Sequence, residues 1–413
     1  MGHWKKGALH CHTLWSDGRT LPEMAVHTYR EMGYDFVCIS DHNVFQDDPD
    51  VWLPVMPDEG KWPSSLSVAE YDRIRAALPG MLEEKQVGFR RYVRLRTFAE
   101  LRERMARPGE FLLLPGEEIT VIDSDFGEGT DRKYHLHWNV FNPPGDLPIP
   151  SRGSAVDLLR QGLVDCTAPG GNSFVMLNHP FWRVWDVSPE LLIDLPEIKL
   201  FEICNSGTSA MPENWIFPRE KFWDFVLAHR LSRDLDPVYG TATDDAHYYD
   251  PDRLHQPNGC GTAWVMLRCP GEFTNEAIRT ALLSGDFYAS CGVSLEEIAF
   301  DPGTGTLRIR VQEEPGTHYR IDFIATGRDF DRSIVHCDFP RTPVKDSRVR
   351  PMIREDVGRL VKRTVGTAGE YTLSPNDLYV RAVVVSDRPP LMRNPFYPEH
   401  PSAWTQPFCM MAN

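Results

Sequence analysis

The sequence lacks the features that mark several common classes of protein. Its 44 lysine and arginine residues are outnumbered by 59 aspartate and glutamate residues, which leaves a formal net charge of −15. Binding to a nucleic-acid backbone or to an anionic membrane surface needs clustered positive charge. We therefore expect neither a nucleic-acid polymer nor a membrane as a partner, whereas a small anionic substrate is compatible with this charge.

Paired cysteines and long apolar runs are also missing. The nine cysteines are scattered and none belongs to a Cys-x-x-Cys motif, so we predict neither a disulfide framework nor a zinc knuckle. No apolar run approaches the roughly 20 residues of a membrane-spanning helix. The lysines at positions 5 and 6 are followed by no apolar segment of the kind found in a signal peptide. These absences predict a cytoplasmic protein.

An alternation of short apolar runs and helical patterns fills the first part of the 413-residue chain, which we place in one domain at residues 1–294. This rhythm is typical of β/α units around a mostly parallel sheet or barrel, so the fold class is α/β. The predicted strands are residues 7–12, 35–40, 111–114, 136–141, 174–177, 200–204, 238–241 and 286–290, and the predicted helices are 22–32, 155–163, 219–229 and 274–284.

The alternation is interrupted at residues 47–110, where we expect a helical insertion. Within it, residues 83–107 hold eight lysines and arginines against four glutamates. This basic stretch is either the solvated face of an amphipathic helix or a cap that draws an anionic substrate inward.

Residues 295–413 have a different pattern, in which apolar and polar residues alternate with a period of two. The alternation is clearest at 307–311, 319–324 and 379–385, and turn residues separate these runs. We therefore predict a second, all-β domain that resembles a sandwich.

A pair of histidines near the start of the chain is the first indication of chemistry. Side chains alternate along a strand, so His10 and His12 would share one face while Cys11 points to the other. Two imidazoles on one face can bind the same metal ion. Asp17 follows in the next loop, where its carboxylate oxygen suits a neighbouring ion.

Histidines and carboxylates recur at the ends of nearly every predicted strand of the first domain. In an α/β barrel, active sites gather at the carboxyl ends of the strands. A mixed histidine and carboxylate set without cysteine suits zinc, manganese or iron in an open catalytic site. Besides His10, His12 and Asp17, the strand ends supply as candidates Asp41, His42, Glu117, Glu118, His135, His137, His179, Glu202, Asp244, Asp245 and His247.

In this order, the motifs resemble the polymerase and histidinol phosphatase (PHP) family of metallohydrolases. They are H-x-H-T-x-x-S-D-G at 10–18, D-H at 41–42, G-x-E at 116–118, His137, H-P at 179–180 and D-x-H at 245–247. The resemblance implies a distorted (β/α)7 barrel with two or three divalent ions. Shorter similarities at 137–139, 286–292 and 403–408 favour the carbaryl-hydrolase-like branch of the family.

The resemblance also implies which residues share an ion. His10, His12, Glu118 and Asp245 would hold the first ion, and Glu118 would bridge to a second ion bound by His137 and His179. Asp17, His42 and His247 would form a third site. If the third site holds no ion, one of these three side chains would instead protonate the leaving oxygen. We therefore expect Glu118, Asp245, His42 and His247 to act in catalysis.

Other residues are candidates for contact with the substrate or with the ligands. Arg183 would bind an anionic group bidentately, and Trp182 and Trp15 would wall the pocket. Glu202 and Asp244 would orient metal-bound imidazoles. Ordinary solvation is an equal alternative for Arg183, Glu202 and Asp244, and packing is the more frequent role of a tryptophan.

Together these patterns predict a metal-dependent hydrolase that acts on a small phosphomonoester or phosphodiester. A carbamate, carboxylic ester or amide hydrolase with the same metal site is the alternative. A non-catalytic binding protein is a third reading, which a complete set of ligands disfavours. The oligomeric state has no signal in the sequence.

Overall fold

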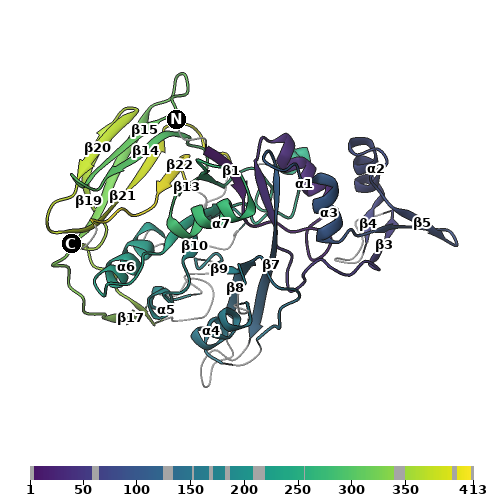
Figure 1. Ribbon diagram of the computed structural model, residues 1–413, viewed down its shortest axis with the longest axis horizontal. Coiled ribbons are helices and arrows are strands. Elements are labelled where there is room, and N and C mark those ends of the chain that lie inside the picture. Colours follow the sequence, from purple (N-terminus) through teal and green to yellow (C-terminus); the bar gives the residue numbers. More distant parts are fainter. Residues whose placement is uncertain are drawn as a thin grey trace.

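A computed structural model of the chain shows a mixed α/β protein built on one large sheet (Figure 1). The described residues are 4–57, 65–123, 134–150, 153–166, 171–181, 187–207, 219–254, 256–338, 349–392 and 398–410. The large sheet has 13 strands in the order β11-β10-β9-β8-β7-β2-β1-β12-β13-β22-β21-β16-β19. Among the described residues, no helix has the length and apolar character needed to cross a membrane.

The first eight strands of this order form the half of the sheet that carries the candidate site. Strands β1, β2, β7, β9, β10 and β11 point the same way, whereas β8 is antiparallel to both neighbours and β12 is antiparallel to β1. The bounds are β1 (Trp4–Ala8), β2 (Phe36–Ile39), β7 (Leu112–Asp123), β8 (Tyr134–Phe141), β9 (Phe174–Leu177), β10 (Leu200–Asn205), β11 (Tyr239–Thr243) and β12 (Trp264–Arg268).

Helices join these strands and have the local signals that begin and end a helix. Pro22 occupies the first turn of α1, and Gly33 follows it with φ +75°. The Thr274 hydroxyl accepts a hydrogen bond from the backbone N–H of Ala277 at the start of α7, and Gly285 ends that helix with φ +77°. The bounds are α1 (Pro22–Glu31), α4 (Ala155–Cys166), α5 (Pro189–Asp194), α6 (Arg219–Leu231), the 3₁₀ helix η1 (Pro251–Arg253) and α7 (Asn275–Ser284).

Two expectations for this half need qualification. The first strand was expected at residues 7–12 but spans Trp4–Ala8, and beyond it Cys11 forms only an isolated bridge with Ala246. A closed barrel of seven β/α units is not shown, since β7 and β8 pair as a long antiparallel hairpin and no helix is described between them.

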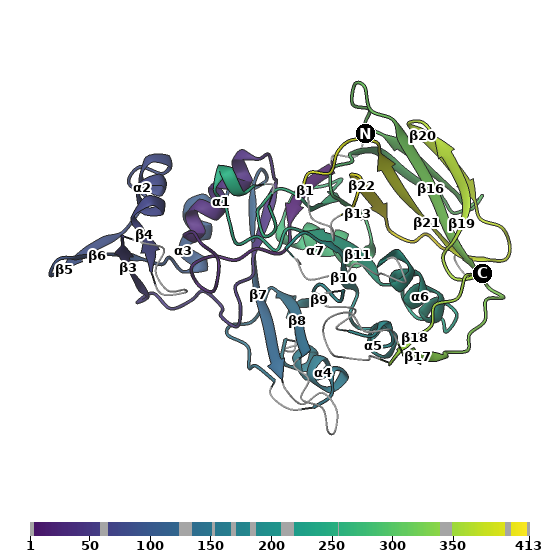
Figure 2. The same ribbon diagram turned by 180° about the vertical axis from the view of Figure 1, so that it is seen from behind.

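The insertion is not the helical segment that the sequence suggested. Its elements are β3 (Trp52–Met56), β4 (Leu66–Ser67), α2 (Val68–Ala77), β5 (Glu84–Val87), β6 (Arg90–Arg94) and α3 (Phe98–Met105), and its strands form a separate sheet in the order β4-β3-β6-β5. The sheet and α2 project from one end of the molecule (Figures 1 and 2). Their core includes Leu14, Leu21 and Met24, so the insertion packs on the segment that carries Asp17.

The basic stretch at 83–107 therefore forms a hairpin and a helix rather than one helical face. Arg94 pairs with Glu100 and Glu83, with the Glu83 contact at 2.8 Å. Arg96 pairs with the buried Glu23 at 3.0 Å. Arg94 and Arg96 are two of the eight basic side chains, and their ion pairs leave the stretch with an excess of positive charge and both alternatives for it open.

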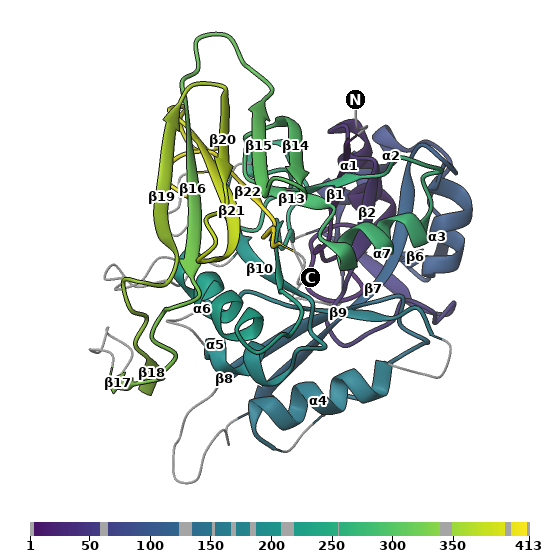
Figure 3. The same ribbon diagram turned by 60° about the vertical axis from the view of Figure 1, so that its left-hand side comes forward.

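The C-terminal part is all-β, as its alternation predicted. Strands β13, β22, β21, β16 and β19 continue the large sheet, and β14, β15 and β20 form a three-stranded sheet that shares one apolar core with it (Figure 3). The bounds are β13 (Phe287–Ser290), β14 (Leu295–Asp301), β15 (Thr306–Val311), β16 (Tyr319–Gly327), β17 (His336–Asp338), β18 (Val349–Pro351), β19 (Arg359–Val365), β20 (Ala368–Thr372), β21 (Asp377–Ser386) and β22 (Ser402–Thr405).

Backbone pairing continues across the domain boundary that we placed after residue 294. Strand β22 lies between β13 and β21, with Ala289 opposite Trp404 on one side and Val383 opposite Trp404 on the other. A buried ion pair adds to this junction, because Arg381 of β21 donates to Asp224 of α6. The two parts thus share one sheet and a common polar contact.

Candidate metal centre

The candidate ligands gather at one edge of the sheet because six of its strands run in the same direction. Four of the loops that follow these strands contribute seven of the nine side chains, and strands β7 and β8 contribute the other two. The positions are His10, His12 and Asp17 after β1, His42 after β2, Glu118 in β7, His137 in β8, His179 after β9, and Asp245 and His247 after β11.

Four of these side chains place their ligand atoms around one point. His12 Nε2 lies 3.1 Å from His10 Nε2, 3.3 Å from Glu118 Oε2 and 3.1 Å from Asp245 Oδ1. His10 Nε2 lies 3.2 Å from Glu118 Oε2 and 3.4 Å from Asp245 Oδ1. Ligand atoms about 2.0–2.1 Å from a tetrahedral zinc ion are about 3.4 Å from one another, so these spacings fit a metal ion.

Glu118 also faces a second group of imidazoles through its other oxygen. His137 Nδ1 lies 3.1 Å and His179 Nε2 lies 3.6 Å from Glu118 Oε1. His42 Nδ1 approaches Glu118 Oε2 at 2.8 Å. The two oxygens of one carboxylate thus point to two adjacent groups of nitrogen ligands, which is the geometry expected of a bridging ligand.

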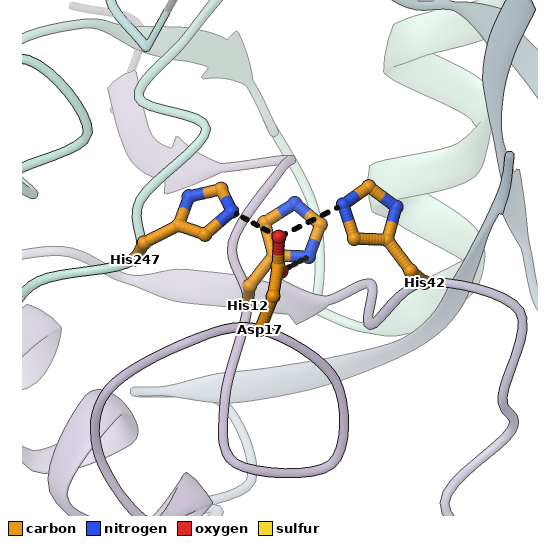
Figure 4. A group of neighbouring side chains, drawn as sticks. All are labelled: His12, Asp17, His42 and His247. Carbon is orange, nitrogen blue, oxygen red and sulfur yellow. Dashed lines mark ion pairs between the residues drawn. The ribbon is translucent and has the colours of Figure 1, made fainter. Parts of the chain in front are cut away.

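A third group is formed by Asp17, His42 and His247, which lie next to His12 (Figure 4). Asp17 Oδ2 lies 3.0 Å from His247 Nε2 and 3.4 Å from His42 Nε2, and Asp17 Oδ1 lies 3.5 Å from His12 Nδ1. The side chains of Asp17, His42 and His247 are 19%, 22% and 16% exposed, whereas those of His10, His12 and Glu118 are fully buried. A substrate would therefore approach from the third group.

The Glu118 carboxylate has an oxygen that the described residues leave unsatisfied. Glu118 Oε2 is buried and receives no hydrogen bond from a described residue, although His10, His12 and His42 place nitrogens 2.8–3.3 Å away. A buried acceptor without a donor is costly. A cation among these atoms would satisfy it, so the residues present fit a divalent metal ion.

The carboxylates of the centre are strongly biased toward their charged form. Burial acts to raise the pKa of Glu118, but the imidazoles of His42 and His10 outweigh it and hold that pKa well below the usual range. At Asp245 and Asp17, burial also acts to raise the pKa, but neighbouring imidazoles outweigh it and lower the pKa far below that of an ordinary aspartate. Charged carboxylates are the form that binds cations.

The histidines divide into two groups. Burial lowers the pKa of His137 to about 4, and burial together with neighbouring imidazoles lowers the pKa of His12. At His10 and His42, burial acts downward but the nearby carboxylates outweigh it and raise the pKa well above its ordinary value. In the metal-free protein the centre therefore holds protons on some imidazoles that a cation would displace.

Neighbouring polar groups hold the ligands in place. Asp41 accepts hydrogen bonds from the backbone N–H of Thr13 at 2.7 Å and from the Ser16 hydroxyl at 2.6 Å, which fixes the loop that carries Asp17. The Asn178 amide donates to Glu118 Oε1 at 2.8 Å. These contacts hold the loop of Asp17 and the carboxylate of Glu118 in place.

Backbone strain is concentrated at two of the candidate ligands. His179 has φ +22° and Asp245 has φ +52°, a region that residues other than glycine rarely adopt. Gly207 passes so close to Asp245 that a Cβ atom at residue 207 would lie 2.8 Å from the Asp245 Cβ. Strain of this kind persists where the surrounding structure requires the conformation, which is common at functional sites.

The other predicted residues have mixed outcomes. The Trp15 indole N–H donates to the carbonyl of Arg96 at 3.0 Å, so it contacts the insertion. Trp182 and Arg183 lie outside the described residues. Glu202 contacts His10 Nδ1 at 2.7 Å, as expected of an orienting group. Asp244 instead accepts from Tyr29 and from the backbone of 261–263.

Sequence reasoning did not single out Thr120, whose hydroxyl lies 2.6 Å from His42 Nδ1. Thr120 follows Glu118 by two residues on the same strand, so both side chains lie on one face of the sheet. This two-residue spacing is the sequence feature that could have identified Thr120. Asp41 and Asn178 each precede a motif histidine in the sequence. Their hydrogen bonds could not be predicted, because these bonds join segments that are far apart along the chain.

Comparisons with known proteins give only distant likenesses. No family model and no curated protein matches the chain. A two-domain protein from Bacteroides vulgatus, described as containing a predicted PHP-like metal-dependent phosphoesterase, has 16% identity and a TM-score of 0.41 over 97% of this chain and 95% of that chain.

Two further solved structures are more distant. A protein from Bifidobacterium adolescentis, provisionally named a metal-dependent phosphoesterase, has 15% identity and a TM-score of 0.32 over 68% of this chain and 97% of that chain. An amidohydrolase from Chromobacterium violaceum has 10% identity and a TM-score of 0.27 over 58% of this chain and 87% of that chain. At these values, the likenesses establish neither fold nor activity for this chain.

Proposed function

We propose that the chain is a metal-dependent hydrolase of the PHP type that acts on a small anionic phosphomonoester or phosphodiester. The observation that carries the proposal is the convergence of His10, His12, Glu118 and Asp245, whose ligand atoms lie 3.1–3.4 Å apart in five measured pairs. A set of buried histidines and carboxylates with this spacing, next to partly exposed ligands, suits a catalytic site rather than a closed structural one.

Each group of ligands has a proposed role. His10, His12, Glu118 and Asp245 would hold one divalent ion, and Glu118, His137 and His179 a second. Asp17, His42 and His247 would hold a third ion or act in its place. Zinc, manganese and iron all fit the histidine and carboxylate set. Bound ions would activate a water molecule for attack and polarise the substrate.

The residues of the chain would then position the substrate and move protons. Glu118 keeps the two deeper groups of ligands close together through its two oxygens. The partly exposed face formed by Asp17, His42 and His247 would receive the substrate. Without a third ion, Asp17, His42 or His247 would give a proton to the leaving oxygen.

Phosphoester, carbamate, ester and amide hydrolysis can share this ligand set, so the bond must be tested directly. The PHP resemblance favours a phosphoester. Carbamate, ester or amide hydrolysis is the alternative, because the same ligand set would serve it. A non-catalytic role is disfavoured because all nine candidate positions hold side chains that can bind a metal.

The proposal is tested by removing divalent ions with a chelator and restoring zinc, manganese or iron one at a time. Hydrolysis of a panel of phosphomonoesters and phosphodiesters should be lost and then recovered, and aryl carbamates, esters and amides should be turned over more slowly. Faster turnover of a carbamate or amide would select the alternative. A protein that binds none of the three metals, or that is unaffected by their removal, would contradict the proposal.

A further inference from the structure

Glu202 of β10 connects the two deeper groups of ligands through a single carboxylate. Its Oε1 lies 2.7 Å from His10 Nδ1, and its Oε2 accepts a hydrogen bond from the backbone N–H of His179 at 2.6 Å. His10 belongs to the first group of candidate ligands and His179 to the second. The side chain of Glu202 is fully buried, so these contacts do not compete with water.

Two more donors complete the surroundings of this carboxylate. The Thr243 hydroxyl donates to Glu202 Oε1 at 2.6 Å, and the Asn205 amide donates to Oε2 at 2.8 Å. Oε2 therefore faces two N–H donors, and Oε1 faces the Thr243 hydroxyl as a donor and one ring nitrogen of His10. The site is built for a group that only accepts hydrogen bonds, which an ionised carboxylate does.

The contact with His10 decides which ring nitrogen of that histidine can bind a metal ion. Because Glu202 Oε1 can only accept, Nδ1 must bear the proton, which leaves the lone pair on Nε2. Nε2 is the atom that lies 3.1 Å from His12 Nε2 and 3.2 Å from Glu118 Oε2. Glu202 thus directs the lone pair of His10 to the place where the first ion would bind.

The contact with His179 acts on the backbone instead of the ring. His179 has the strained φ of +22°, and its N–H points to Glu202 Oε2. This hydrogen bond stabilises a conformation that would otherwise be costly and that places His179 Nε2 3.6 Å from Glu118 Oε1. One buried carboxylate therefore supports both deeper groups of ligands.

We propose that Glu202 is a positioning residue that selects the Nδ1-protonated tautomer of His10 and fixes His179, so that the first metal ion depends on its carboxylate. The inference rests on the proposed function, because it assumes that the centre binds divalent ions. Groups of this kind typically change metal affinity by about 10- to 100-fold.

Glutamine at position 202 would have one preferred orientation. If its amide nitrogen faced His179 N–H and the Asn205 amide, two donor pairs would oppose each other. The amide nitrogen would therefore face His10 Nδ1 and the Thr243 hydroxyl, because both can accept a hydrogen bond. In that orientation His10 would have to protonate Nε2, which blocks metal binding by that atom.

The experiment compares Glu202→Gln with two control variants by equilibrium dialysis against zinc at neutral pH. Glu117→Gln is the matched control, because Glu117 is also a buried strand glutamate but bonds only to the backbone N–H of Leu147 among the described residues. Thr243→Val removes one donor and keeps the carboxylate. Glu202→Gln should weaken the tightest zinc by about 10- to 100-fold, and both controls should stay within about threefold of wild type.

A purely structural role for Glu202 predicts a different result. It would lower the melting temperature of the metal-free protein and leave zinc affinity unchanged in the folded fraction. If Glu202→Gln does not fold, nitrogen-15 spectra of the zinc-loaded wild type decide the question, since His10 should show a protonated Nδ1 and a zinc-bound Nε2. Zinc on Nδ1 of His10 would overturn the inference.

The outcomes also separate this inference from the proposed function. Wild-type protein that binds no zinc, manganese or iron would overturn both. Wild-type protein that binds zinc with the same affinity as Glu202→Gln would overturn only the role of Glu202, and the proposal of a metal-dependent hydrolase would stand.

Discussion

Two buried clusters of charged side chains compensate their charge in different ways. At the junction between α6 and β21, Arg381 donates to both oxygens of Asp224 at 2.7–2.8 Å, and the Tyr379 hydroxyl donates to the same carboxylate. At the candidate metal centre, three carboxylates face six imidazoles, and no lysine or arginine forms an ion pair with those carboxylates among the described residues.

The difference indicates what each cluster needs from outside the chain. Asp224 and Arg381 have opposite charges, and their hydrogen bonds are made within the protein. In the metal centre, lone pairs converge instead, and protons on His10 and His42 compensate the carboxylates only while no cation is present. The charges of the junction are balanced within the protein, whereas the centre is arranged for a ligand with positive charge.

The largest expected effect follows from breaking the centre at its shared ligand. Glu118→Gln removes the charge that both deeper groups of ligands face, so we expect hydrolysis of the best substrate to fall by at least about 10³-fold. Steady-state kinetics with excess metal measures the loss. The adjacent Glu117→Gln on the other face of β7 is the control and should retain activity within about twofold. Equal losses in both variants would contradict a special role for Glu118.

The second prediction breaks the junction and should leave the metal centre intact. Arg381→Met leaves the fully buried Asp224 charge without its cation, which should reduce the free energy of unfolding by about 3–5 kcal/mol. Denaturant unfolding measures this change. Zinc stoichiometry of the folded variant should equal that of wild type. A destabilisation below about 1 kcal/mol would show that the ion pair does not hold the two parts together.

The smallest expected effect concerns Glu117, which is buried but belongs to neither cluster. Burial raises its pKa from 4.5 to about 8, so between these values the folded protein retains a proton that the unfolded chain has lost. The free energy of unfolding therefore falls as pH rises through this range. Glu117→Gln cannot lose that proton and should gain at least about 1 kcal/mol over wild type between about pH 5 and pH 8.

Chemical unfolding of the metal-free proteins at the two pH values tests this prediction. Absence of metal matters, because an ion bound at Glu118 would add its own pH dependence. Glu118→Gln is unsuitable as a control here, and Glu70→Gln serves instead because Glu70 is a buried glutamate of the insertion that pairs with Arg73. A difference between Glu117→Gln and wild type that is the same at both pH values would contradict the raised pKa.

The sequence predicted the candidate centre better than it predicted the fold around it. Histidines and carboxylates at strand ends are a local signal, because parallel strands bring their carboxyl ends to one edge. The structure accordingly gathers His10, Glu118, Asp245 and the other six candidates. Their roles as metal ligands stay predictions until an ion is measured.

The features that were missed depend on contacts between distant segments. The pattern of charged residues in the insertion predicted a helix. In the structure, however, β6 (Arg90–Arg94) pairs with β5 and β3 in a sheet. The bond from Glu202 to the His179 backbone joins segments 23 residues apart and has no periodic pattern. Strand pairing and polar contacts of this kind are fixed by tertiary packing, which local propensity does not encode.

The position of β22 has a consequence for how the chain is made. This strand lies between β13 and β21 in the sheet, yet it consists of residues 402–405 of a 413-residue chain. During synthesis, β13 and β21 would emerge from the ribosome with unpaired edges, and the large sheet would stay divided until residues 402–405 had been translated. Completion of the sheet therefore waits for β22, and a chain that stops before residue 402 would leave both edges exposed to aggregation.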